Sequence, residues 1–344
     1  MESTSTKALD NPRNAKIALW GGITFSLAFT ALIWWAGDRL ASVPHLPDQG
    51  PAWYYWKLAT PTFWTHFTAW IFYALHQVAL WSLIFYAQTR VKKYTPGLHP
   101  VNVVALGVNA VFILLHFVQT QIWYDGLAQD VSIFSSQGSV ILMLVAILLM
   151  ENQRRGLFFG RKVSLLKRMG AFARKYHGYL FAWATVYTFW YHPMENTLGH
   201  LAGFLYMFLL LLQGSLFLTR IHVNKWWTLT QEVAVGVHGT LVAVLQGNNL
   251  WQMFAFGFAG IFIVTQMHGL KFSRLTRGII LGVFIVATLA VYSQRGWVQL
   301  NEILRIPLIE YLAVFFMAGL IALGLWIAGH VKASKALMEV KTRE

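Results

Sequence analysis

The chain has 344 residues, of which 57% are hydrophobic and only 12% are charged. Soluble proteins carry about 25% charged residues, so this composition excludes an ordinary soluble domain and indicates a multi-pass membrane protein. The formal net charge of +14 does not predict nucleic-acid binding, because the cationic residues lie between apolar runs and form no single basic face. The absence of cysteine excludes disulfides, thiol chemistry and covalent c-type haem, and leaves histidine, methionine and carboxylates as metal ligands.

The first 16 residues are polar, and no small-residue cleavage site follows a short apolar core, so the first apolar run is expected to be a retained span. A helix needs roughly 20 mainly apolar residues to cross a bilayer. Ten segments meet this requirement, some of them with short or uncertain ends. In chain order they are 17–36, 63–86, 100–122, 134–150, 176–191, 198–219, 229–247, 251–268, 278–294 and 307–330.

The distribution of positive charge predicts the topology. If the N-terminus is cytoplasmic, 23 of the 27 Lys and Arg residues fall in the N-terminal segment, the loops after even-numbered spans and the C-terminal tail. Cytoplasmic loops carry such an excess of cations, and a wrong number of spans would scramble the alternation. We therefore expect an all-α bundle of ten transmembrane helices with both ends cytoplasmic, located in a bacterial inner membrane.

The loops are too short to hold a separate soluble domain. We expect residues 1–16 to form a cytoplasmic segment, residues 17–330 a ten-helix transmembrane domain, and residues 331–344 a basic cytoplasmic tail. The longest cytoplasmic loop, 151–175, is basic and partly apolar, which is typical of a segment held at anionic headgroups. The aromatic run 53–57 in the first outer loop is explained by an interfacial aromatic belt.

The region from Tyr176 to Arg220 is expected to be a buried helical hairpin. Two apolar helices are joined there by a short polar turn, and three groups that can bind a metal or carry a proton fall within nine positions: His192, Glu195 and His200. Polar residues inside a bilayer are costly and usually face the interior of the bundle. The hairpin is therefore predicted to provide the polar centre of the molecule.

The other histidines are sorted by their predicted depth. His66 and His116 are expected near the outer face, together with the turn of the hairpin. His76 and His238 are expected near the midplane on different helices, and His177 at the inner end of the fifth span. An unpartnered imidazole in hydrocarbon costs several kcal/mol, so each midplane histidine should have a partner.

One hypothesis for the function is a b-type cytochrome that transfers electrons. Neutral imidazoles from facing helices hold haem b in membrane bundles. The expected ligands are drawn from His76, His238, His177, His192 and His200. His177 and His192 are 15 residues apart, about 22 Å and roughly on one helix face. This spacing is similar to that of ferric-reductase-like and other b-type membrane cytochromes. Because the sequence shows no flavin or nucleotide module, we expect electrons to come from a redox partner protein or from quinol.

A second hypothesis is a membrane metal-binding protein or metalloenzyme. Its ligands would be two imidazoles and a carboxylate from the hairpin, completed by an outer histidine. The expected ligand set for a transition metal ion is His192, Glu195, His200, His66 and His116. The ordinary alternative is that these groups only form hydrogen bonds that hold a buried turn.

A third hypothesis is a proton-coupled transporter, with intramembrane polar groups such as Asn109, Glu232 and Glu310 as relay residues. Transporters often have repeated halves and helices broken by Gly or Pro, and neither feature is evident here. A structural subunit of a larger membrane complex is also consistent with the sequence. The lipid bilayer is the expected environment in every case, and no motif assigns a catalytic residue or decides whether the protein is an enzyme.

Overall fold

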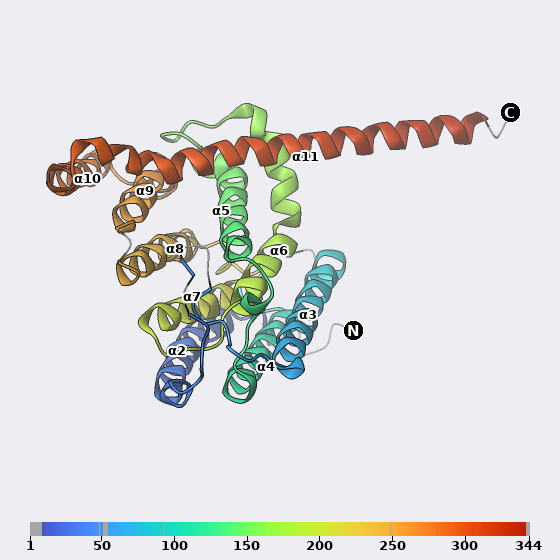
Figure 1. The fold of residues 1–344 in the computed structure, drawn as a ribbon. Helices are drawn as coiled ribbons and strands as arrows, with labels where there is room; N and C mark the ends of the chain where they lie inside the picture. The colour runs from blue at the N-terminus through green and yellow to red at the C-terminus, as the bar shows by residue number, and fades with distance from the viewer. Residues whose placement is uncertain (1–8, 48, 51–53, 92, 248, 342–344) are drawn as a thin grey trace. The chain divides into compact units, whose positions relative to one another are not determined.

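The fold was derived from a computed structural model that describes residues 9–47, 49–50, 54–91, 93–247 and 249–341. The described residues form helices and three isolated β-bridges (Figure 1). The long helices are α2 (Pro12–Ala36), α3 (Phe63–Tyr86), α4 (Pro100–Trp123), α5 (Ile133–Arg155), α6 (Lys167–Phe189), α7 (Leu198–Ser215), α8 (Lys225–Leu245), α9 (Trp251–Val264), α10 (Arg274–Arg295) and α11 (Glu302–Lys341). Each predicted apolar segment corresponds to one of these helices, which confirms the predicted all-α class for the described residues.

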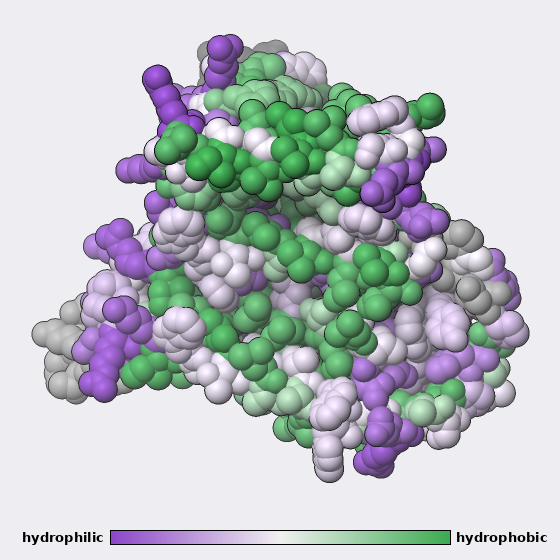
Figure 2. Space-filling view, turned by 90° about the vertical axis from the view of Figure 1, so that its left-hand side faces the viewer, coloured by the Kyte–Doolittle hydropathy of each residue, from purple (hydrophilic) through white to green (hydrophobic). Residues whose placement is uncertain are grey.

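Eight helices in the described part of the chain are long and apolar enough to cross a membrane, namely α2, α3, α4, α5, α7, α8, α10 and α11. They expose many large apolar side chains, and Figure 2 shows hydrophobic residues over much of the face in view. Such surfaces suggest an integral membrane protein, because exposed apolar area is unfavourable in water but not in contact with lipid. Two helices matching predicted spans fall outside this set: α6 begins with charged residues, and α9 has only 14.

Local sequence signals explain where several helices begin. Asn11 accepts a hydrogen bond from the Arg13 amide before α2, and Pro12 occupies the first helical position. Thr62 and Thr65 form a reciprocal capping box at α3. At α7, Thr197 accepts the backbone N–H of His200, which places that imidazole in the first turn.

The chain divides into two compact units. The first comprises residues 1–143 and 178–251, and the second comprises residues 144–177 and 252–344. In the first unit α7 packs against α2, α4 and α8, while α3 packs against α4. Phe29 of α2 contacts Phe117 and Phe208 edge-on, at ring-centroid distances of 5.6 and 5.7 Å. Helix α7 is therefore the central element of this unit.

The second unit is held by polar contacts at both ends of its helices. The side chain of Asn152 forms two hydrogen bonds with the backbone of Val163, which fixes the loop after α5. The hydroxyl of Thr265 donates to the carbonyl of Leu157 at 2.5 Å. At the other end of α10, Arg295 donates two hydrogen bonds of 2.8 Å to the buried carboxylate of Glu302.

The predicted terminal segments are described only in part. Residues 1–8 and 342–344 lie outside the described residues, as does Trp53 of the aromatic run. Residues 331–341 of the predicted tail continue α11 as helix. The basic segment after α5 contains a short 3-10 turn, Ser164–Leu166, and continues directly into α6.

Candidate functional site

The turn between α6 and α7 is buried and held by its neighbours. The backbone N–H of Met194 donates to Thr120 at 3.1 Å, and His116 Nε2 donates to the carbonyl of His192 at 2.9 Å. A Cβ at Gly126 would lie 2.4 Å from the carbonyl oxygen of Tyr191, so only glycine permits this approach. The backbone of the turn is therefore fixed against α4 and the loop that follows it.

Two histidines of the turn region lie in direct contact. The rings of His192 and His200 are 5.1 Å apart and nearly perpendicular. Trp56 packs edge-on against His200 at 4.3 Å, and the Tyr54 hydroxyl lies 3.4 Å from His192 Nδ1. The predicted proximity of these two imidazoles is present in the structure, and aromatic residues of the loop between α2 and α3 pack against them.

The His200 ring has one engaged nitrogen and one free nitrogen. Its Nδ1 lies 2.8 Å from the Thr197 hydroxyl, the residue that caps α7. Its Nε2 is buried and has no hydrogen-bond partner among the described residues. A buried polar atom without a partner costs free energy, so such an atom in a native site calls for a ligand or a water molecule.

Glu195 belongs to a hydrogen-bonded chain that leads from the turn to His45, in the loop between α2 and α3. The Tyr124 hydroxyl donates to Glu195 Oε1 at 2.5 Å, and His45 Nε2 donates to the Tyr124 oxygen at 2.8 Å. Burial, followed by the Glu195 carboxylate, raises the pKa of Tyr124 well above its usual range. Burial lowers the pKa of His45, against the opposing effect of Glu195. Glu195 and Tyr124 are buried and His45 is half-buried, so the chain connects the interior with the surface.

His238 on α8 is a third imidazole near this pair. Burial, then the proximity of His238 and His116, lowers the pKa of His192 to about 3. His192 is therefore neutral at physiological pH. The ring of His238 packs against α7 where Gly203 leaves room, since a Cβ at that position would lie 3.1 Å from His238 Cε1. His238 Nδ1 is also buried without a partner among the described residues.

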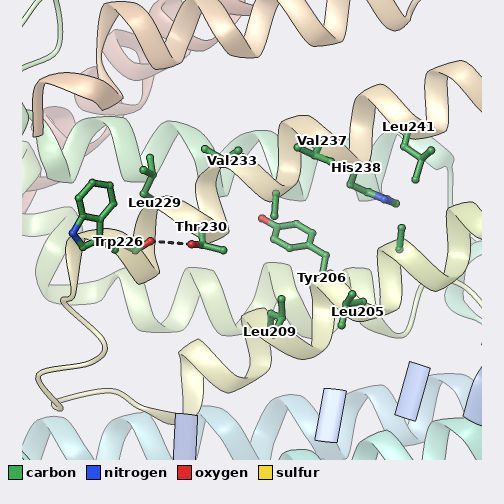
Figure 3. A pocket seen from close by; sticks show the side chains of 12 residues that line it. Leu205, Tyr206, Leu209, Trp226, Leu229, Thr230, Val233, Val237, His238 and Leu241 are labelled. Atoms are coloured by element: carbon green, nitrogen blue, oxygen red, sulfur yellow. Dashed lines mark hydrogen bonds between the residues drawn. The ribbon is translucent and has the colours of Figure 1, made fainter. Parts of the chain in front are cut away.

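An apolar groove between α7 and α8 has His238 near one end. Figure 3 shows Leu205, Tyr206 and Leu209 of α7 facing side chains of α8 across it. The groove has a volume of about 570 Å³. From Trp226 to Leu241 its α8 wall rises about 22 Å, close to the length of an extended lipid tail. Its shape and lining fit a long apolar chain with a polar group at the His238 end.

His76 and His238, the two histidines predicted near the midplane, lie in different environments. His76 Nε2 donates to Asn109 at 2.7 Å, and Trp190 Nε1 donates to His76 Nδ1 at 3.2 Å. The ring also stacks on Phe112 at 4.4 Å. Both nitrogens of His76 are thus used in an interhelical network, whereas His238 faces the groove. The two residues occupy different environments in the first unit.

The remaining predicted ligands have other partners. His116 uses Nε2 on the turn backbone, and its Nδ1 lies 3.1 Å from the Gln119 side chain. His66 Nδ1 lies 2.8 Å from Asp130 Oδ1. His177 Nδ1 donates to the carbonyl of Arg174 at 2.7 Å, in the second unit. Because α6 ends at Phe189, the helical spacing that related His177 to His192 does not extend to the turn.

These positions bear on both ligand hypotheses. Within the described ranges, no three histidine, aspartate or glutamate side chains are arranged to hold a metal ion. Two imidazoles on opposite sides of a haem iron have ring centres about 6 Å apart, because metal–nitrogen bonds are near 2 Å. His192 and His200 contact each other directly at 5.1 Å, with no space for a macrocycle between them. Haem and metal binding stay predictions.

Several residues of the site were not anticipated. Tyr54 and Trp56 belong to the aromatic run that was assigned to the membrane interface, and Tyr124 and His45 carried no motif. Asp125 is also buried, and burial raises its pKa to about 7, against the lowering effect of the Gly126 amide. These residues approach the hairpin from loops 70 or more positions away in sequence. No local pattern encodes such contacts.

Comparison with protein families, with curated proteins and with solved structures finds no match for this chain.

Proposed function

We propose that this protein binds a neutral, lipid-soluble ligand of the quinone or quinol class at the histidine cluster formed by His192, His200 and His238. One observation carries the proposal: two buried imidazole nitrogens, His200 Nε2 and His238 Nδ1, have no partner among the described residues, and His238 lies near one end of an apolar groove. A quinone carbonyl or quinol hydroxyl would satisfy such nitrogens, and an isoprenoid tail would fill the groove.

The electrostatics of the cluster favour a neutral headgroup. His192 is uncharged at physiological pH, and the Glu195 carboxylate lies beside Tyr124 in the same region. A phosphate headgroup would meet neutral imidazoles and an acidic side chain instead of cations. A quinone or quinol exchanges hydrogen bonds without introducing a full charge. The ligand class therefore follows from the chemistry of the donors and acceptors.

The chain from Glu195 through Tyr124 to His45 supports a role in proton exchange with a bound quinol. Its hydrogen bonds are short, at 2.5 and 2.8 Å, and they connect the buried turn with a half-buried imidazole. Neutral imidazoles are suitable proton acceptors because they can take up a proton when a ligand hydroxyl is deprotonated. In this proposal the histidine cluster binds the headgroup of the ligand. The hydrogen-bonded chain then carries the proton of the headgroup to or from His45, in the loop between α2 and α3.

The proposal includes a topology. Ten helices would cross the bacterial inner membrane with both ends cytoplasmic, as the loop charges predict, and the histidine cluster would then lie toward the outer face. Electron transfer from quinol to haem b or to a redox partner is a further prediction. A visible spectrum of purified protein after dithionite reduction tests it, since bound haem b would give Soret and α bands.

The ligand proposal is tested by titrating the detergent-purified protein with a benzoquinone carrying a decyl tail. Quinones quench tryptophan fluorescence, and Trp56 packs against His200 while Trp226 lines the groove. We expect saturable quenching that is weakened about tenfold in His238→Leu, because one hydrogen bond to a buried group is lost. His330→Leu, which removes an exposed histidine on α11, is the matched control and should titrate like the wild type.

His238→Gln keeps a polar group and serves if the leucine variant does not fold. Quenching that does not saturate, or equal affinities of all variants for the quinone, would refute binding at this cluster.

A further inference from the structure

A cationic corner lies in the second unit, far in sequence from the histidine cluster. It comprises Arg154 and Arg155 at the end of α5, the loop glycine Gly160, His268, and Arg277 in the first turn of α10. These residues are brought together by the contacts between the 156–161 loop and the 3-10 turn Gln266–Gly269.

His268 orients the Arg277 side chain as a neutral partner. His268 Nε2 donates to the carbonyl of Ile263 at 3.2 Å, which leaves Nδ1 as an acceptor for Arg277 Nη1 at 3.3 Å. Burial, then the charge of Arg277, lowers the pKa of His268. The guanidinium is thus held by an uncharged ring. Its Nε is buried and has no hydrogen-bond partner among the described residues.

Two glycines bring the backbone close to these cations. A Cβ at Gly269 would lie 3.0 Å from Arg155 Cβ and 3.3 Å from Arg154 Nη1. Gly160 has a φ of +80°, and a Cβ there would lie 3.4 Å from His268 Nδ1. The corner therefore brings the Arg154 guanidinium beside Gly269, and the His268 ring that holds Arg277 beside Gly160, two positions that carry no side chain. Arg154 has a carboxylate partner in Glu151, and Arg277 Nη1 is held by the neutral His268 ring.

The position of the corner indicates the kind of anion that binds there. It lies at the ends of α5 and α10, both of which are apolar enough to cross a membrane. Phe159 beside His268 and Leu275 beside Arg274 are exposed apolar side chains, 64% and 75% accessible. Cationic groups flanked by exposed apolar residues at helix ends are typical of sites for lipid headgroups.

We propose that this corner binds the phosphate of an anionic phospholipid, with the guanidinium groups of Arg277 and Arg154 as donors and with Phe159 and Leu275 against the acyl chains. Guanidinium groups form strong charge-assisted hydrogen bonds with phosphate oxygens. The site is in the second unit and uses none of the residues of the histidine cluster, so its failure or success is independent of quinone binding.

The test measures lipid retention by native mass spectrometry. Purified full-length protein is exchanged into micelles that contain equal amounts of phosphatidylglycerol and phosphatidylcholine. We expect preferential retention of phosphatidylglycerol by the wild type, and an affinity reduced about tenfold or more in Arg277→Gln because a charge-assisted hydrogen bond is lost. Arg305→Gln removes an exposed arginine that donates hydrogen bonds to Asn301 and is no part of the corner, and it should behave like the wild type.

Arg277→Lys preserves the charge and should retain intermediate affinity; it replaces the glutamine variant if that variant does not fold. Equal retention of the two lipids, or unchanged phosphatidylglycerol affinity in Arg277→Gln, would overturn the proposal. A parallel arm adds inorganic phosphate, and displacement of the lipid by millimolar phosphate would identify a site for the free ion and overturn the assignment to lipid.

Discussion

Replacing His76 by alanine distinguishes a structural imidazole from a haem ligand. In the structure this ring connects α3 with α4 through Asn109, at 2.7 Å, and accepts a hydrogen bond from Trp190 at 3.2 Å. His76→Ala would leave the Asn109 carbonyl and the Trp190 N–H buried without this partner and would remove the stacking on Phe112. The substitution is therefore expected to destabilise the first unit.

The expected loss of stability follows from the buried polar groups that would lose their hydrogen-bond partner. Each buried polar group that loses its partner costs about 1–3 kcal/mol in soluble proteins. Interhelical hydrogen bonds in membranes average about 0.6 kcal/mol and reach about 1.7. A cavity term is added because the deleted ring is fully buried. We expect a loss of about 2–4 kcal/mol in the free energy of unfolding.

Unfolding by SDS in mixed micelles measures this loss, and the visible spectrum of the same samples is recorded in parallel. His330→Ala, an exposed position on α11, is the control and should leave the stability unchanged within error. The reasoning would be refuted if His76→Ala unfolded like the wild type. Loss of a Soret band without loss of stability would instead identify His76 as a haem ligand.

Three further predictions concern the loops around the histidine cluster. Burial raises the pKa of Asp125 from 3.8 to about 7, so its contribution to stability is present at low pH and is lost as the pH rises between those values. Asp125→Asn should remove this pH dependence. Between pH 4 and pH 8 the wild type should lose up to about 4 kcal/mol of unfolding free energy that the variant keeps, as measured by unfolding at both pH values. Parallel pH profiles of the two proteins would contradict this. Gly126→Ala should strongly reduce the midpoint of thermal unfolding, because the added Cβ would lie 2.4 Å from a backbone oxygen. The control Gly138→Ala has open space around it and should leave the midpoint unchanged. Equal midpoints for the two variants would show that the turn can shift. Tyr124→Phe should cost about 1.5–3 kcal/mol by removing the donor to the buried Glu195 carboxylate, and an unchanged unfolding curve would argue against that hydrogen bond.

The sequence predicted the helices well and the partners of the polar residues poorly. Apolar runs of about 20 residues set the positions of the helices, and caps such as Thr62 and Thr197 mark their first turns. The contact between His192 and His200 was predictable because eight residues and one tight turn separate them. The Trp56 contact was not, since it depends on how a loop more than 130 residues away folds onto the turn.

The depth in the membrane that the sequence predicts did not distinguish His76 from His238. Both were expected near the midplane, but the environment of each ring is decided by neighbours on other helices. Asn109 and Trp190 occupy both nitrogens of His76. Gly203 opens a space for His238 beside the groove. Such differences arise from tertiary packing, which periodicity and hydropathy do not encode.

The most direct test of the central claim is the ligand content of the protein as it is purified from membranes. Solvent extraction followed by liquid chromatography and mass spectrometry should recover a stoichiometric isoprenoid quinone from the wild type. Gly203→Leu, which would crowd His238 and the end of the groove, should yield much less, while Gly214→Leu on the same helix, with nothing within 4 Å of its Cβ, should match the wild type. Absence of quinone from the wild type, or equal recovery from the two variants, would contradict the account.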